Sequence, residues 1–259
     1  LQPAALIGHS IGEMIALTIA DALTLEDALK VVVARAALMQ SVPAGTGAMA
    51  SCFCSEDEIA PILQGSNVEI AAINSPRNIT IAGLNEDVAA VIEKLKSARM
   101  RAVPLQVSHA FHSRTMDPIL EQFRKFLASV TFREPQLPVI SNITGKELTV
   151  SEWNADYLVR HIRSTVQFAR GIRSLAEDHH INCFLECGPA PVLVSLAKQT
   201  HAHPHAVWIH AAKKDQDDLE SYLRVKQALF VSGLRIDQAN RYSGKMIRRV
   251  PLPTYAWQW

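Results

Sequence analysis

The chain has 259 residues, 48% of them hydrophobic, and its 26 Lys and Arg against 25 Asp and Glu give a formal net charge of +1. This length allows one large domain or a core that carries an insertion, and a nearly neutral chain without a basic, aromatic-rich stripe is a poor nucleic-acid binder. No apolar run reaches the ~18 residues that a membrane span needs and no signal segment opens the chain, so we expect a soluble cytoplasmic protein without nucleic-acid or membrane partners.

The first predicted elements are a strand, a sharp turn and a helix. Residues 3–7 are apolar, Gly-His-Ser-Ile-Gly follows at 8–12, and residues 13–20 have helical character. Gly-x-Ser-x-Gly between a strand and a helix is typical of a nucleophile elbow, which places Ser10 at a helix N-terminus where free N–H groups can hold an oxyanion. The alternative is a plain turn with an incidental serine. Because a lone strand makes no sheet, we expect upstream strands and hence a fragment.

The next elements predict a small subdomain inserted into a larger core. A helix begins after Thr24 and runs through Met39. The order that follows is strand, helix, strand, strand, helix, strand, over residues 48–53, 55–58 onward, 68–74, 79–83, 86–96 and 102–107. This βαββαβ order is typical of a ferredoxin-like unit. We therefore assign residues 47–107 to a ferredoxin-like subdomain and residues 1–46 and 108–213 to an α/β core.

The core resumes after residue 115. Helices are expected at 118–127, 168–177, 192–198 and 219–231, strands at 137–141, 181–186 and 206–210, and a polar stretch around Trp153. Pro251 and Pro253 alternate with other residues, so residues 248–255 should be extended and packed against another surface.

A serine nucleophile needs a base, and ten histidines compete for that role. His9 adjoins Ser10, but a neighbour on an elbow points away from the hydroxyl. His109 and His112 follow a predicted strand end, where catalytic groups collect, although a solvated loop or a satisfied core histidine is the alternative. The histidines of residues 201–210 have no cysteine or paired carboxylate beside them, so we expect no metal site there.

Arg35 lies in apolar surroundings on its predicted helix. Its neighbours three and four positions away are Val31, Val32, Leu38 and Met39, and none can pair with it. A buried guanidinium needs an anion, and its planar fork suits a carboxylate. The alternatives are an ion pair with a distant acid, or a side chain that extends to water.

Several motifs together resemble malonyl-CoA acyltransferase domains over nearly the whole chain. These are Gly-His-Ser-Ile-Gly-Glu at 8–13, Arg35 before Leu-Met-Gln, His-Ala-Phe-His-Ser at 109–113, Ser-Asn-Ile-Thr-Gly at 141–145 and Glu-Cys-Gly-Pro at 186–189. Residues 250–255 resemble the linker that follows this domain in type I polyketide synthases, so residues 214–259 are expected to be that linker. The resemblance implies an α/β-hydrolase-like core with a ferredoxin-like insertion, cut from a megasynthase with neighbouring ketosynthase and other domains.

The resemblance also implies residue roles. Ser10 would be the nucleophile, His112 the general base and then acid, and Arg35 the clamp on the substrate carboxylate. The Ile11 N–H would be one oxyanion donor, and the main-chain carbonyl of Gln167 would orient the histidine. The family's second oxyanion donor, a glutamine in an upstream Gly-Gln-Gly segment, has no counterpart in this sequence.

Substrate choice follows from size. Malonyl-selective members of the family resemble His-Ala-Phe-His here and tolerate an aliphatic residue such as Ile11 after the serine. Phe111 would crowd an α-methyl branch, a misfit worth ~1–3 kcal/mol, unless it serves only loop packing. His9 and His109 are assigned, with Arg35 and Phe111, to the substrate-binding residues.

The expected reaction moves a malonyl group from malonyl-CoA to Ser10, and then to the phosphopantetheine thiol of an acyl carrier protein. Neither a metal nor a permanently bound cofactor is expected. Two alternatives remain at this point: a serine thioesterase or esterase on the same elbow, and an inactive structural fragment of a megasynthase. A hydrolase would need an acidic residue to orient the histidine, and Arg35 argues against it.

Overall fold

The computed structural model describes residues 2–236 and residue 251. The predicted tail at 248–255 therefore lies, apart from Pro251, outside the described residues. The strands are β1 (Leu6–Ile7), β2 (Gly47–Cys52), β3 (Glu69–Ser75), β4 (Asn78–Leu84), β5 (Ala102–Pro104), β6 (Val139–Ile140), β7 (Cys183–Glu186) and β8 (Val207–His210). The helices are α1 (Gly12–Ile19), α2 (Leu25–Ser41), α3 (Glu56–Leu63), α4 (Asn85–Ser97), the 3-10 helix η1 (Arg114–Ile119), α5 (Leu120–Leu127), α6 (Ala155–Arg163), α7 (Phe168–Glu177), α8 (Leu193–Thr200) and α9 (Asp218–Val231).

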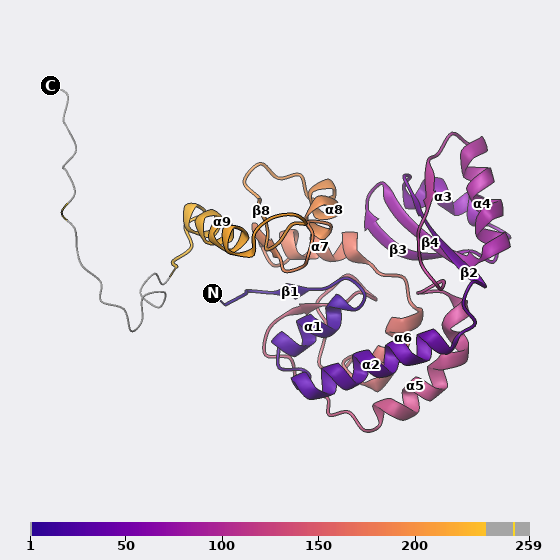
Figure 1. Ribbon diagram of the computed structural model, residues 1–259, viewed down its shortest axis with the longest axis horizontal. Helices are drawn as coiled ribbons and strands as arrows, with labels where there is room; N and C mark the ends of the chain where they lie inside the picture. The colour runs from indigo at the N-terminus through magenta and orange to yellow at the C-terminus, as the bar shows by residue number, and fades with distance from the viewer. Residues whose placement is uncertain (1, 237–250, 252–259) are drawn as a thin grey trace.

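The smaller unit is an antiparallel four-stranded sheet in the order β3-β4-β2-β5, with α3 and α4 packed against it (Figure 1). Helix α3 begins at a capping box, in which the Ser55 hydroxyl accepts from Glu58 N and the Glu58 carboxylate accepts from Ser55 N. Alternating apolar residues of the strands and one face of α4 form a separate core, with Ile79, Ile81, Val88, Val91 and Leu95 all buried. This is the predicted ferredoxin-like topology. The boundaries at residues 47 and 107 stay predictions.

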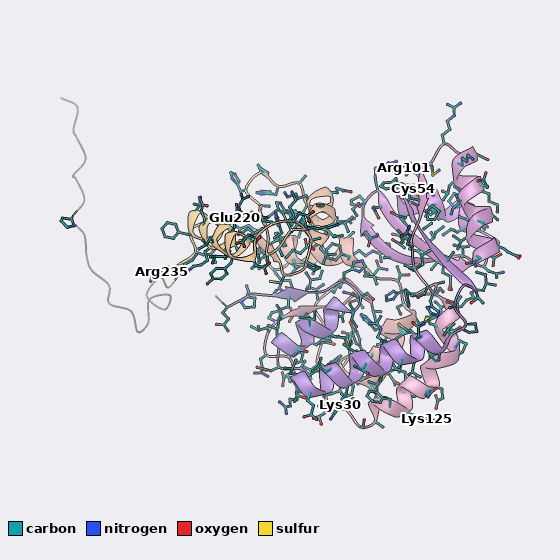
Figure 2. All side chains as sticks on the ribbon, in the orientation of Figure 1. Lys30, Cys54, Arg101, Lys125, Glu220 and Arg235 are labelled. Carbon is teal, nitrogen blue, oxygen red and sulfur yellow. The ribbon has the colours of Figure 1, made fainter. Side chains whose placement is uncertain are left out.

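The larger unit surrounds a second core formed by α1, α2, η1, α5 and α6. Helix α2 begins where the Thr24 hydroxyl accepts from Asp27 N at 3.0 Å. Strands β1 and β6 pair in parallel, so the turn that follows β1 and the loop that follows β6 lie side by side. Lys30 and Lys125 project outward from α2 and α5, on the far side of this core from the turn (Figure 2). None of the helices in the described part of the chain is long and apolar enough to cross a membrane.

A short segment after α6 connects the two units. Val166 N donates to Ala71 O at 2.9 Å, and Ile73 N donates to Val166 O at 2.9 Å, so this segment extends the β3 edge of the small sheet. The Arg163 guanidinium is 2.7 Å from the Glu69 carboxylate of β3. Helix α7 follows this segment, and the parallel strands β7 and β8 form a separate sheet that contacts α8 and α9, which Figure 1 labels with β8.

Candidate active site

Ser10 lies in the turn between β1 and α1, as the elbow motif predicts. Its φ is 50°, a left-handed conformation that costs energy for a residue with a side chain and is typical of functional turns. A Cβ atom on Gly8 would come within 2.1 Å of Glu13 N, whereas a Cβ on Gly12 would meet nothing within 4 Å. Sterically, the turn therefore requires the first glycine of the motif and not the second.

The Ser10 hydroxyl and His112 form a dyad. Ser10 Oγ is 2.7 Å from His112 Nε2, and His112 Nδ1 is 2.9 Å from the carbonyl oxygen of Ser164. A carbonyl only accepts hydrogen bonds, so Nδ1 carries the proton and Nε2 presents its lone pair to the hydroxyl. The dyad therefore has the tautomer that can remove the Ser10 proton.

The surroundings of His112 keep it neutral. Its side chain is 5% exposed. Burial places the pKa of His112 well below its ordinary value, and the nearby His161 and Arg35 lower it further, while the hydrogen bond to Ser164 raises it. At neutral pH the imidazole is unprotonated, which is the state that a general base needs.

The residue that orients His112 corrects one prediction. The accepting carbonyl belongs to Ser164 and not to Gln167. Helix α6 ends at Arg163, and Ser164 takes an extended conformation (φ −79°, ψ 152°), which frees its carbonyl from the helix to meet the imidazole. Gln167 is the N-cap of α7, and its N–H donates to Asn142 O at 2.7 Å.

Helix α6 was not among the elements predicted from the sequence, which placed a polar stretch around Trp153. Residues 154–162 nevertheless carry two features that indicate a helix. Asn154 caps the helix by accepting from Tyr157 N at 3.1 Å. The buried residues that follow have helical spacing: Tyr157, Leu158, His161 and Ile162.

The Gln167 side chain borders an open pocket of about 380 Å³ between the two units. The rest of its lining comes from Glu69, Ile70, Ile143 and residues 163–165. Gln167 Oε1 is buried and accepts no hydrogen bond from any described residue.

Arg35 points from α2 into the site. Its side chain is 5% exposed, and Nη2 donates to Ser10 Oγ at 3.1 Å. Two further donors, Nε and Nη1, are buried and have no partner among the described residues. Among residues 2–236, no Asp or Glu carboxylate lies within 4.0 Å of the guanidinium; burial lowers the pKa of Arg35 to about 10, and the charge of Glu13 opposes this shift. The site therefore holds a cation with unused donors beside Ser10.

The Ile11 N–H is a main-chain donor that the turn leaves free. The next three N–H groups bond within the turn, since Gly12 N donates to His9 O, Glu13 N to Ser10 O and Met14 N to Ile11 O. No described residue accepts a hydrogen bond from Ile11 N. This free donor at the start of α1 agrees with the predicted oxyanion role.

The remaining candidates, His9, His109 and Phe111, have partners within the protein. His9 Nε2 is 2.8 Å from Asn74 Oδ1, and burial lowers the pKa of this histidine. His109 bonds through both ring nitrogens, to Ser108 Oγ at 2.7 Å and to Val42 O at 2.8 Å, and its ring centroid is 5.9 Å from that of Phe111. The structure therefore brings both His112 and Arg35 into hydrogen-bond contact with Ser10 Oγ, and shows no hydrogen bond between Ser10 and either His9 or His109.

A buried polar cluster behind the dyad was not predicted. Glu13 is 0% exposed, and its carboxylate accepts from Asn142 N at 2.8 Å and from the Tyr157 hydroxyl. His161 Nε2 lies 3.3 Å from Glu13 Oε2, and the His161 ring centroid is 6.0 Å from that of His112. An acid on an otherwise apolar helix, directly after the elbow motif, is the signal that could have indicated it.

The sequence matches the acyl transferase domain family over residues 1–236. The chain belongs to this family. It is 41% identical over 261 residues to phenolphthiocerol synthesis polyketide synthase type I Pks15/1 of Mycobacterium marinum, and covers 12% of that protein. This acyltransferase domain therefore spans only a small part of its curated relative.

Solved structures support the same assignment. The acyltransferase domain from the second module of the salinomycin polyketide synthase is 37% identical, with a TM-score of 0.92 over 98% of this chain and 60% of that one. An acyl-carrier-protein S-malonyltransferase from Burkholderia pseudomallei is 32% identical, with a TM-score of 0.76 over 86% of this chain and 74% of that one. These comparisons confirm the predicted fold class, an α/β-hydrolase-like core with a ferredoxin-like subdomain. In the described part of the chain, no three His, Cys, Asp or Glu side chains, including those of residues 201–210, form a group that could hold a metal.

Proposed function

We propose that this acyltransferase domain moves a malonyl group from malonyl-CoA to the phosphopantetheine thiol of an acyl carrier protein, through an ester on Ser10. The observation that carries the proposal is Arg35. A buried guanidinium 3.1 Å from the nucleophile, with Nε and Nη1 unused, suits a substrate that brings its own carboxylate. The similarity to an S-malonyltransferase supports the same substrate class.

The first half-reaction forms the ester. Ser10 Oγ attacks the thioester carbonyl carbon while its proton passes to His112 Nε2. The Ile11 N–H stabilises the oxyanion, and its collapse breaks the carbon–sulfur bond. The departing coenzyme A sulfur takes the proton from His112, so the base returns to its neutral state.

The second half-reaction reverses these steps with another thiol. The phosphopantetheine thiol gives its proton to His112 and attacks the Ser10 ester. The tetrahedral intermediate expels Ser10 Oγ, which recovers a proton from His112. Throughout, Arg35 holds the free carboxylate, so an acyl group without one is bound less well, by ~10²–10³-fold.

We further propose that the site selects the acyl group by size. Phe111 excludes an α-methyl branch, so malonyl is preferred over methylmalonyl. His9 and His109 act less directly, because their rings are held by Asn74, Ser108 and Val42. By analogy with its relatives, the domain would work within a cytoplasmic megasynthase beside a ketosynthase and a carrier protein.

Intact mass spectrometry after mixing with malonyl-CoA or acetyl-CoA tests the proposal. We expect a malonyl adduct on Ser10 that is stable until a carrier protein is added. Arg35→Ala should slow malonylation by ~10²–10³-fold and spare acetylation. Arg124→Ala, which removes an arginine paired with Asp156 on the outside of α5, is the matched control and should change neither.

Other outcomes would identify other functions. Rapid loss of the adduct to water would indicate a thioesterase, and no adduct at all would indicate an inactive fragment. Equal losses of malonylation and acetylation in Arg35→Ala would refute the carboxylate clamp.

A further inference from the structure

Asn142 follows β6 and lies between the elbow, α1 and α7. It is 2% exposed, and all of its polar groups have partners. Its side chain reaches both sides of the elbow, because Nδ2 donates to Gly8 O at 2.9 Å and Oδ1 accepts from Ser10 N at 2.6 Å. Its main chain bonds to two other elements, because its N–H donates to Glu13 Oε2 at 2.8 Å and its carbonyl accepts from Gln167 N at 2.7 Å.

The side-chain bonds meet the needs of a strained turn. Ser10 has a φ of 50°, and such a conformation in a residue with a side chain persists only where its surroundings fix it. Residues 8 and 10 present one acceptor and one donor toward Asn142. A carboxamide offers the complementary donor and acceptor, whereas a carboxylate offers only acceptors.

The main-chain bonds connect the nucleophile to the support of its base. Gln167 lies three residues after Ser164, whose carbonyl orients His112, and the Gln167 N–H is bound to Asn142. The same residue therefore contacts the turn that aims Ser10 Oγ and the segment that aims the imidazole. We propose that Asn142 is a positioning residue, which fixes Ser10 relative to His112 and turns the free Ile11 N–H toward the reacting carbonyl.

This inference rests on the proposed role of Ser10 as a nucleophile, so its test uses two reagents. One is malonyl-CoA, and the other is phenylmethylsulfonyl fluoride, which needs an activated serine but no acyl-CoA site. In the second reaction Ser10 Oγ bonds to sulfur, the sulfur–fluorine bond breaks, and the hydroxyl proton passes to His112. Intact mass over time gives both the rate constant for modification of Ser10 and the final modified fraction.

Asn142→Ala removes both side-chain bonds, and Asn142→Asp keeps the shape and the acceptor while it loses the donor to Gly8. We expect the rate constant to fall ~10–10²-fold with both reagents in each variant, because a small misplacement of reacting atoms has an effect of this size. The final modified fraction should stay at the wild-type level, and KM for malonyl-CoA should change by less than about twofold.

Ser55→Ala is the matched control, because it removes a helix cap in the small subdomain and so lowers stability away from the elbow. It should keep the wild-type rate constant despite a lower melting temperature. The inference is overturned if a folded Asn142 variant reacts at the wild-type rate, or if only the final modified fraction falls, since that is loss of folded protein.

The two proposals fail in different ways. Wild-type protein that reacts with the sulfonyl fluoride but not with malonyl-CoA would refute malonyl transfer, while the sulfonylation rates would still test Asn142. Wild-type protein whose Ser10 reacts with neither reagent would overturn the positioning role as well, because there would be no activated nucleophile to position.

Discussion

Replacing Arg35 with methionine should make the free protein more stable and the enzyme less selective. Arg35 is 5% exposed, and no described carboxylate lies within 4.0 Å of it, although the charge of Glu13 acts on it from further away. Methionine has a similar reach and no charge, and the side chains next to it on α2 are apolar. The variant therefore separates the energetic cost of burying the cation from its proposed role in binding the substrate carboxylate.

The magnitude follows from the pKa of Arg35, which burial lowers from 12.5 to about 10. Each unit corresponds to ~1.4 kcal/mol, so the folded protein disfavours the charged form by about 3 kcal/mol. Loss of the hydrogen bond from Nη2 to Ser10 Oγ offsets ~1 kcal/mol. The net gain in the free energy of unfolding is roughly 2 kcal/mol, or about 4–8 °C in melting temperature for a chain of this size.

Thermal unfolding with and without malonate is the assay. Without ligand, Arg35→Met should melt above the wild type. Malonate should raise the melting temperature of the wild type only, since a ligand stabilises the state that binds it. Arg163→Met is the control, because Arg163 is already paired with Glu69 and Asp117, and its replacement should lower the melting temperature.

Two results would refute this reasoning. If Arg35→Met melts below the wild type, the guanidinium stabilises the free protein, and the cost of burying it is smaller than the stabilisation from its contacts. If malonate stabilises the wild type and Arg35→Met equally, the dicarboxylate binds elsewhere.

Three further predictions concern the dyad, the buried cluster around Glu13 and the side chain of Phe111. Because the pKa of His112 lies well below its ordinary value, the rate of Ser10 acylation should be level through neutral pH and fall only in acid. The free energy of unfolding should fall as the pH drops below ~6.5, where the histidine takes up a proton in the unfolded chain but not in the folded one. pH–rate profiles and thermal unfolding between pH 4 and pH 8 measure the two effects. Tyr157→Phe leaves a buried Glu13 oxygen without its donor and should lower the free energy of unfolding by ~1–3 kcal/mol in urea titrations, and an unchanged midpoint would count against the cluster. Phe111→Ser should raise methylmalonyl transfer relative to malonyl transfer by ~10-fold in competition assays. An unchanged ratio would indicate that Phe111 serves only to pack the loop.

Local patterns predicted most of the fold and part of the site. The elbow at residues 8–12, the cap at Thr24 and the βαββαβ order depend on residues near one another in the chain, and sequence spacing records such features well. The choice of His112 over other histidines came from a resemblance, because nothing local distinguishes it from His109. The structure does distinguish them, since only His112 contacts Ser10 Oγ.

The rest of the site depends on contacts that spacing does not record. Glu13 is held by Asn142 and Tyr157, which lie 129 and 144 positions further along the chain. The orienting carbonyl was misplaced by three residues, because any main-chain carbonyl can accept a hydrogen bond and side-chain identity does not mark the one that does. The position where α6 ends decides it, and that helix was missed.

The segment after α6 contacts both parts of the molecule. The Ser164 carbonyl sets the tautomer of His112. Two residues later, Val166 forms main-chain hydrogen bonds with Ala71 and Ile73 at the edge of the small sheet. The carbonyl that fixes the His112 tautomer and the hydrogen bonds that join the two parts therefore lie within three residues of one chain segment. The orientation of the His112 lone pair toward Ser10 is thus built from both parts of the molecule and not from the larger part alone.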